Sequence, residues 1–487
     1  MAKVLSNIEP KLVWSIFEDI TQVPRPSKHE EKIIKFLKDW AKERGYEVES
    51  DKVGNFVIRK PATKGMESKK GVCIQGHVDM VCEKNEDTEF DFFNDPIQPY
   101  IDGDWVKAKG TTLGADNGVG VAMGLAVLES GMPHPDMEIL CTLDEETGLT
   151  GAMGLGKDLL KTSDILINLD TEDDGHFTIG CAGGLNTLAS FKYEAEDVPG
   201  DSIPYKINIK GFKGGHSGIE IDDERANAAK FLNRLLWHLT NKYNIRLSSF
   251  NSGKKHNAIP REGFAEVMVA KSAEKDFLAY VKQFHEQTVN EYGTKEPDAE
   301  ITAEKTEAPK KVMSEKMQKN MLNSFYAMPH GIYRWSPDID GLVQTSTNFA
   351  IVETKEDEVF VLTSQRSSVE TEKYDIANTV KACLELGGAH VSFTDGYPAW
   401  EPNVESPILK EGIEIYKQIF DKEPVIEAIH AGLECGLIGE KYPGMDMLSF
   451  GPTLKEVHTP AEKISISTTQ NTWNLLEGII KDIPEKK

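Results

Sequence analysis

The stretch Gly71-Val-Cys-Ile-Gln-Gly-His-Val-Asp-Met-Val81 decides how the rest of this sequence is interpreted. An apolar run typical of a buried strand ends at a glycine, and His77 and Asp79 follow it. Residues two apart in an extended chain face the same way, so both side chains can point at one site from the end of a strand. A histidine that binds a metal ion needs an acceptor for its second ring nitrogen, often a carboxylate. The His-x-Asp pattern therefore predicts a metal ligand together with its orienting group.

Three later stretches add carboxylates at the same kind of position. Taken singly, each has a plain structural explanation: a helix cap, a solvated acidic loop or a polar residue at a strand edge. Taken together, they follow strands or open a helix, which is where open α/β sheets bind ligands. The residues are Asp116 in a glycine-rich turn, Glu145 and Glu146 after the strand predicted at 137–143, and Asp170 at the end of the strand predicted at 165–170.

A second histidine completes this set. One histidine with several carboxylates is most of the ligand set of a two-metal hydrolytic site. His458 follows the apolar run 447–450 and suits the missing position. Because His458 lies far in sequence from His77, the domain that holds both is expected to be split by an insertion.

The ordered motifs resemble the di-zinc metallopeptidase family that includes carboxypeptidase G, aminoacylase and several dipeptidases. The similarity runs along nearly the whole chain. Within the family, three further motifs look like the bacterial aminoacyl-histidine dipeptidases, also called cytosolic non-specific dipeptidases. These three motifs are Gly214-Gly-His-Ser-Gly218, Asn257-Ala-Ile-Pro260 and His430-Ala-Gly-Leu-Glu-Cys-Gly436.

The resemblance implies a site for two Zn²⁺ ions, with Co²⁺ or Mn²⁺ as substitutes. Asp116 would bridge the two ions. His77 and Asp170 would bind one of them, and Glu146 and His458 would bind the other.

The resemblance also implies roles for the residues beside the ligands. Glu145 would be the general base, which accepts a proton from metal-bound water and passes it to the leaving amine. Chemistry alone allows the roles of Glu145 and Glu146 to be exchanged. Asp79 would accept a hydrogen bond from the second ring nitrogen of His77 and so orient the ring. The peptide bond between Asp116 and Asn117 would be cis.

A small substrate also needs its ends recognised. Arg366 can bind a C-terminal carboxylate through two parallel hydrogen bonds, although an isolated arginine at a strand end is usually a surface charge. His216 could reach the substrate carbonyl from its glycine-rich turn, with a turn histidine bonded to backbone as the alternative. Asn257, His430 and Glu434 resemble substrate-pocket positions of the family, and Glu434 could meet an α-amino group.

The order of expected elements predicts an α/β fold with two domains. A doubly wound catalytic domain would be split into residues 1–185 and 400–487, and an inserted α+β lid domain would span 186–399. Segments within 205–304 follow the β-α-β-β-α-β order of a ferredoxin-like sheet covered by helices. Segments within 314–395 resemble the same unit without its first strand, so we expect the lid to be doubled. The family resemblance likewise implies a zinc-binding domain and a lid.

Composition limits the classes of function. The 487 residues exceed one ordinary core, and 39% apolar with 28% charged residues suit a soluble globular enzyme. The net charge of −24 opposes binding to nucleic acid or to an anionic membrane. No stretch approaches the roughly 20 apolar residues of a membrane span. Residues 1–20 lack a signal-peptide core, so we expect a cytoplasmic protein with reduced cysteines.

The leading hypothesis is metal-dependent hydrolysis of dipeptides in peptide catabolism, by a zinc-held hydroxide with Glu145 as base. Substrates would be Xaa-His dipeptides and others, including β-alanyl-histidine. The alternative is an N-acyl amino acid deacylase on the same metal core; the expected doubled lid and the match at 430–436 favour the dipeptidase. A non-catalytic metal-bound binding protein would have no need of Glu145. Small peptides are the expected partners of a monomer or homodimer.

Overall fold

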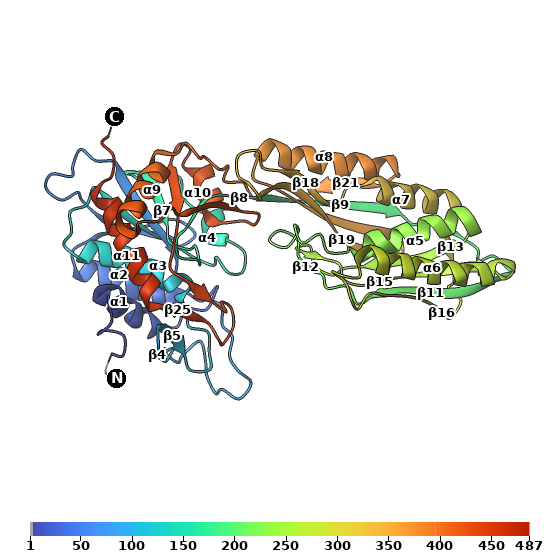
Figure 1. The fold of residues 1–487 in the computed structure, drawn as a ribbon, viewed down its shortest axis with the longest axis horizontal. Helices are drawn as coiled ribbons and strands as arrows, with labels where there is room; N and C mark the ends of the chain where they lie inside the picture. The colour runs from blue at the N-terminus through green and yellow to red at the C-terminus, as the bar shows by residue number, and fades with distance from the viewer. Residues whose placement is uncertain (1–2, 395, 487) are drawn as a thin grey trace. The chain divides into compact units, whose positions relative to one another are not determined.

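The computed structural model describes residues 3–394 and 396–486. Contacts divide the chain into two compact units, shown as ribbons in Figure 1. Unit 1 comprises Met1–Gly180, Pro402–Ala428 and Leu433–Lys487, and unit 2 comprises Cys181–Glu401 and Ile429–Gly432. Residues 1, 2, 395 and 487 fall within the predicted domains, 395 at the expected end of the last lid strand, and lie outside the described residues.

Unit 1 is built on an eight-stranded sheet in the order β1-β2-β6-β3-β7-β23-β8-β22. Strands β6, β3, β7 and β23 run parallel in its centre, and β1 and β2 form an antiparallel edge. Every residue of β3 and β6 is buried, as expected for parallel strands covered on both faces. The strands are β1 (Glu47–Ser50), β2 (Phe56–Lys60), β3 (Gly71–His77), β6 (Met137–Thr142), β7 (Ser163–Asn168), β8 (His176–Cys181), β22 (Val425–Ile429) and β23 (Asp446–Ser449).

Helix α3 (Ala115–Glu129) packs directly on this sheet, against β3 and β6. Residues 119–128 of this helix are apolar or glycine on every side and are all buried. A Cβ at Gly124 would lie 3.0 Å from the Ile139 side chain, so glycine allows the close approach of helix and sheet. The other helices are α1 (Lys11–Thr21), α2 (Glu31–Glu43), α4 (Thr150–Met153), α9 (Pro407–Phe420), α10 (Glu434–Lys441) and α11 (Ile466–Lys481).

A small four-stranded sheet positions the C-terminal segment of unit 1. Its order is β24-β25-β5-β4, so the hairpin β24–β25 pairs with strands from the first third of the chain. The sequence analysis did not predict this sheet, because strands of two to four residues are too short to show a periodic pattern. The strands are β4 (Pro99–Asp102), β5 (Trp105–Ala108), β24 (Leu454–Lys455) and β25 (Lys463–Ser465).

Unit 2 holds a long sheet in the order β16-β11-β15-β13-β19-β20-β9-β21, with β18 (Gly331–Trp335) paired to β19. Its first half has the predicted β-α-β-β-α-β order. If strands are numbered within that half, their arrangement is 4-1-3-2, which is ferredoxin-like. The elements are β11 (Ser202–Lys210), α5 (Ala228–Tyr243), β13 (Arg246–Ser252), β15 (Gly263–Ala270), α6 (Glu274–Tyr292) and β16 (Glu300–Lys305).

The second half has the mirrored arrangement 2-3-1-4. Its strand 1 is β9 (Gly183–Lys192), which the sequence analysis did not predict. β9 precedes the whole first half in the chain, so sequence proximity did not link it to its neighbours β20 and β21. The remaining elements are α7 (Glu315–Ala327), β19 (Val343–Thr354), β20 (Glu358–Ser367), α8 (Glu370–Leu386) and β21 (His390–Phe393). A separate two-stranded sheet pairs β12 (Gly215–His216) with β14 (Ala258–Ile259).

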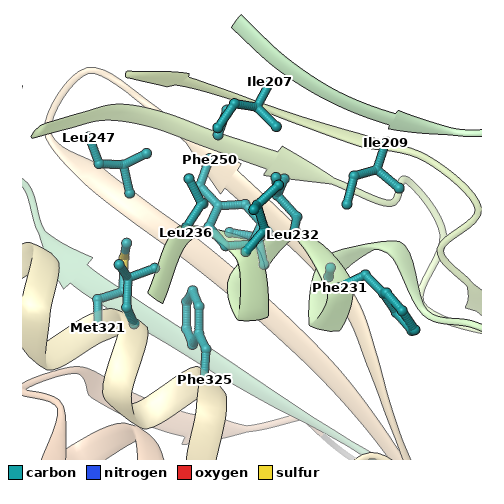
Figure 2. Close-up of a cluster of buried hydrophobic side chains, with 14 of the residues drawn as sticks. Ile207, Ile209, Phe231, Leu232, Leu236, Leu247, Phe250, Met321 and Phe325 are labelled. Atoms are coloured by element: carbon teal, nitrogen blue, oxygen red, sulfur yellow. The ribbon is translucent and has the colours of Figure 1, made fainter. Parts of the chain in front are cut away.

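One apolar core joins the two halves of unit 2. Figure 2 shows side chains of β11, α5, β13 and α7 converging in it. The Phe325 ring of α7 lies 5.8 Å from that of Phe250 on β13 and 5.1 Å from that of Phe349 on β19. Such aromatic pairs contribute about 0.5–1.5 kcal/mol each beyond the area they bury, so Phe325 stabilises the junction between the halves. Among the described residues, none of the helices is long and apolar enough to span a membrane.

Candidate metal centre

The carboxyl ends of three neighbouring parallel strands carry the predicted ligands of unit 1. His77 is the last residue of β3, Glu146 follows β6, and Asp170 follows β7. Asp116 lies in the first turn of α3, which packs on the same strands. His458 lies between β24 and β25, in the segment that the small sheet holds against β5.

Asp116 lies between the two histidines. Its Oδ1 atom is 3.0 Å from His77 Nε2, and its Oδ2 atom is 3.1 Å from His458 Nε2. Asp170 Oδ1 is 3.8 Å from His77 Nε2, and Glu146 Oε2 is 3.0 Å from His458 Nε2. Among the described residues, two of the four groups of potential ligand atoms, each within 4.8 Å, contain Asp116: one with His77 and Asp170, the other with Glu146 and His458. This is the arrangement that a bridging carboxylate needs.

Asn117 orients the neighbouring ligands. The Asp116–Asn117 peptide bond is cis, as the family resemblance implied. The Asn117 side-chain amide donates to the carbonyl oxygen of Leu169 at 2.7 Å and to the Asp170 carboxylate. Asn117, in the first turn of α3, and Asp170, after β7, are thus tied to each other directly.

The electrostatics of the centre favour bound positive charge. Burial lowers the pKa of His77, but the neighbouring carboxylates raise it more, and the result lies well above the usual value. Hydrogen bonds with Asp116 and Glu146 raise the pKa of His458 to about 11. Burial beside the other acids raises the pKa of Asp170 well above its usual value. Such shifts arise where several carboxylates share a site with few cations.

The donor set fits divalent cations. Imidazole nitrogens and carboxylate oxygens are ligands that zinc uses in proteins, and a hydrolytic pair of ions is commonly joined by shared ligands. Glu146 Oε1 is buried and lacks a hydrogen-bond partner among the described residues, so it has an unused lone pair for a cation. The residues present therefore fit two metal ions.

Asp79 links His77 to the acidic loop after β6. Its Oδ1 atom lies 3.3 Å from His77 Nδ1 and accepts the backbone N–H of Glu145 at 3.1 Å. Its Oδ2 atom accepts the backbone N–H of Glu146 at 3.3 Å and the Ser27 hydroxyl at 2.8 Å. Both glutamates fall in a further group of potential ligand atoms with His77, whereas Glu146 alone is grouped with Asp116 and His458. Burial raises the pKa of Glu145 to about 8.

Glu434 is a buried carboxylate close to Glu145, whose pKa it helps to raise. Its Oε2 atom accepts hydrogen bonds from Gln75 Nε2 at 2.6 Å and from the Thr142 hydroxyl at 2.8 Å. Its Oε1 atom is buried without a hydrogen-bond partner among the described residues. Burial raises the pKa of Glu434 to about 7.

The other predicted substrate residues lie together in unit 2. His216, Arg366 and His430 surround Gly218: a Cβ there would lie 3.1 Å from Arg366 Nε, 3.1 Å from His216 Cε1 and 2.4 Å from the His430 carbonyl oxygen. Asn257 directly precedes β14, which pairs with the strand that ends at His216. His430 belongs to the short segment Ile429–Gly432 that is part of unit 2.

Arg366 is not a surface charge. The side chain is 7% exposed, its Nη atom donates to the Tyr397 hydroxyl at 2.8 Å, and its Nε–H is buried without a partner among the described residues. Burial and the Arg366 charge lower the pKa of His430 to about 3, and His430 Nε2 lies 2.7 Å from the Ser346 hydroxyl. The buried guanidinium of Arg366 therefore lies beside two neutral groups, the Tyr397 hydroxyl and the His430 ring.

His216 is bonded to backbone, as the alternative interpretation of its turn proposed. Its Nδ1 atom accepts the N–H groups of Gly218 at 3.2 Å and Ile219 at 3.0 Å. Burial and the charge of Arg366 lower the pKa of His216. A neutral ring that accepts at Nδ1 carries its proton on Nε2, so His216 keeps one donor for another group.

Comparison with known proteins shows the family. The chain matches the model of peptidase family M20/M25/M40 over residues 73–482. It belongs to this family. It is 42% identical over 483 residues, 99% of each chain, to the cytosol non-specific dipeptidase of Escherichia coli (strain K12).

Solved structures show the same fold. The crystal structure of aminoacylhistidine dipeptidase from Vibrio alginolyticus is similar to the M20 chain with a TM-score of 0.94 and 41% identity, over 100% of this chain and 99% of that one. Aminopeptidase PepT from Bacillus cereus shares the fold, with a TM-score of 0.60 at 18% identity over 98% and 99% of the two chains. The family predicted from the ligand motifs and the α/β fold class predicted from the order of elements are confirmed.

Arg25 and Glu462 are buried charged side chains of this M20 chain that the sequence analysis missed. Arg25, 2% exposed, donates to the carbonyl oxygens of Val78 at 3.1 Å and Asp79 at 2.7 Å, and to that of Gly114. Glu462, 3% exposed, accepts backbone N–H groups of residues 113–116. In a single sequence, an arginine between two prolines and a glutamate in a polar loop look like ordinary surface residues.

Proposed function

We propose that this chain is a metal-dependent dipeptidase. The observation that carries the proposal is Asp116, which presents its two oxygens to two histidines, each beside a further carboxylate. The full-length similarity to proteins named as dipeptidases supports the reaction class. Its substrates would be free dipeptides, Xaa-His among them and including β-alanyl-histidine.

Two Zn²⁺ ions, with Co²⁺ or Mn²⁺ as substitutes, would occupy the two ligand groups. When bound, the ions would polarise the scissile carbonyl and lower the pKa of water. The proposed ligands are His77, Asp116 and Asp170 for one ion, and Asp116, Glu146 and His458 for the other.

Glu145 would move the protons of the reaction. Its carboxylate lies beside the ligand Glu146, where it can accept a proton from the attacking water and donate it to the leaving amine. Burial raises its pKa, which is the direction needed by a group that must both take up and release a proton. Asp79 would hold His77 and the backbone of this loop in place.

Separate groups would bind the two ends of a dipeptide. Glu434 Oε1, a buried acceptor without a protein donor, would bind the α-amino group. Arg366, a buried cation with an unused N–H, would bind the carboxylate. His216 would donate from Nε2 to the peptide carbonyl, and Asn257 and His430 would shape the pocket.

Further proposals concern organisation and setting. The division into a catalytic domain of residues 1–185 and 400–487 and a lid domain of 186–399 stays a proposal, as does a monomer or homodimer. The word cytosol in the name of the E. coli relative supports a cytoplasmic location. The full-length similarity to proteins named as dipeptidases supports small peptides as partners. The net charge of −24 argues against nucleic acid and anionic membranes.

The alternative is an N-acyl amino acid deacylase on the same metal centre. An acylated nitrogen carries no positive charge, so a buried carboxylate at Glu434 favours a substrate with a free amino group. The test compares hydrolysis of alanyl-histidine and N-acetyl-histidine by the zinc-loaded protein, with free histidine as the measured product. We expect turnover of the dipeptide; preference for the acetylated compound would support the deacylase. No turnover of either, with both ions bound, would support a binding protein.

A further inference from the structure

We propose that Glu462 is a positioning residue that sets the spacing between the two metal-ligand groups, an inference that rests on the proposed metal centre. Its Oε2 atom accepts the N–H groups of Leu113 at 2.7 Å and Gly114 at 3.0 Å. Its Oε1 atom accepts those of Ala115 at 2.8 Å and Asp116 at 3.5 Å. Both oxygens thus hold the turn that carries the bridging carboxylate.

The number of donors explains how a charge can be buried here. An isolated buried carboxylate is costly, and this one is 3% exposed. Four N–H groups of the turn at residues 113–116 supply charge-assisted hydrogen bonds. The turn and Glu462 therefore stabilise each other, and neither is well satisfied without the other.

Glu462 also fixes the loop of His458. The two residues are four apart in the segment between β24 and β25, and the Glu462 N–H donates to the Thr459 carbonyl at 3.0 Å. His458 has φ +61°, in the left-handed region, and its side chain is half exposed, so packing alone holds it weakly. The carboxylate of Glu462 ties this loop to the turn of Asp116, and hence one ligand group to the bridge.

Arg25 ties the same turn to the other ligand group. It joins the carbonyl of Gly114 to those of Val78 and Asp79, directly after His77. A Cβ at Gly114 would lie 2.4 Å from an Arg25 Nη atom, so glycine makes this contact possible. The bridging residue is therefore held by a buried cation on the His77 side and by a buried anion on the His458 side.

The test uses zinc alone as the probe. Glu462→Gln offers one acceptor oxygen and turns an NH₂ group toward backbone N–H donors. In titrations of metal-free protein against a competing chelator, wild type should bind two ions. The variant should bind the ion proposed for Asp116, Glu146 and His458 about 10- to 100-fold more weakly, which is the effect expected when a group that orients ligands is lost. Its affinity for the other ion should be unchanged. For a dipeptide, kcat should fall more than KM rises.

Glu138, on β6 of the eight-stranded sheet of the same unit, is a matched control. It is 0% exposed and accepts the N–H groups of Lys161, Thr162 and Ser163, at the end of β6 opposite to the metal centre. Glu138→Gln should lower the melting temperature and leave both zinc dissociation constants unchanged. Glu462→Asp keeps the charge and replaces the amide variant in the test if that variant does not fold. It should weaken the binding of the same ion by a smaller factor.

Three outcomes would overturn the inference. Unchanged zinc binding by Glu462→Gln, or by Glu462→Asp where the amide variant does not fold, would show that Glu462 has no positioning role. Equal weakening of both ions, matched by Glu138→Gln, would show a general effect of stability. Wild-type protein that binds fewer than two zinc ions would overturn both this inference and the proposed metal centre, which separates the failure of one from the failure of the other.

Discussion

His77 Nδ1 lies 3.3 Å from Asp79 Oδ1, and both side chains are almost completely buried. The pair leaves His77 Nε2 to face Asp116 and Asp170. Burial raises the pKa of Asp79, but the contact with His77 outweighs this effect and lowers the pKa to about 2. Asp79 is therefore an anion at neutral pH. An anion behind the ring fixes its orientation and makes Nε2 a better electron donor.

Asp79→Asn should therefore weaken metal binding about 10- to 100-fold, the range typical of groups that support a metal-binding histidine. Chelator-competition titration of the metal-free protein with zinc measures this directly. The weakening should be largest for the ion bound by His77. Unchanged zinc affinity together with lost activity would instead show that Asp79 acts on the reaction and not on the ligand.

Glu145→Gln should lower kcat for a dipeptide by at least about two to four orders of magnitude, the contribution typical of a general acid–base group. Both ions should remain bound, because Glu145 lies outside the two ligand groups that share Asp116. Metal analysis of the purified variant and initial rates with alanyl-histidine are the measurements. Near-normal activity would show that Glu145 is not the general base. Loss of an ion would indicate that Glu145 and Glu146 have exchanged roles.

The sequence could predict that these side chains lie close together because most of them follow an element whose pattern is strong. The fully buried strands β3 and β6 and the buried residues 165–168 of β7 form short apolar runs, and parallel strands place their carboxyl ends at one edge of the sheet. That rule predicts that His77, Glu146 and Asp170 approach one another, as they do. The position of Asp116 in a glycine-rich turn before an apolar helix adds the fourth side chain.

The parts that could not be predicted depend on contacts between distant segments. β9 completes the second half of the long sheet through pairing with β20 and β21, well over a hundred residues further along the chain. β25 has three residues, too few for any pattern. Burial of Arg25 and Glu462 depends on backbone groups near residue 114, which no local signal reveals.

Glu434→Gln should raise KM for dipeptides with a free amino group and affect N-acetylated substrates little. The neutral amide loses the charge that a protonated amine would meet, while Gln75 and Thr142 can still bond to its oxygen. Loss of a charged hydrogen bond of about 1.5–3 kcal/mol corresponds to roughly 10- to 100-fold in kcat/KM. Steady-state kinetics on alanyl-histidine and N-acetyl-histidine would test this, and equal losses on both would contradict it.

Arg366 offers a means of selecting substrate length. The side chain extends from β20, a strand paired on both sides by β19 and β9, so its position is rigid. Tyr397 holds one end of the guanidinium through a 2.8 Å hydrogen bond, and the Nε–H remains without a protein partner. A dipeptide carboxylate could satisfy this cation, whereas a longer peptide would place an uncharged amide there and leave the cation unpaired.

Arg366→Ala should therefore lower kcat/KM for dipeptides by about two to three orders of magnitude, as expected for a buried charged hydrogen-bond pair. Arg366→Lys should recover part of this loss, because an ammonium group cannot form the planar two-bond contact. Dipeptide amides should be poor substrates of the wild-type protein, and Arg366→Ala should cost them little. Parallel kinetics on a dipeptide and its amide decide the matter: equal losses would show that Arg366 supports the structure of unit 2 and does not recognise the carboxylate.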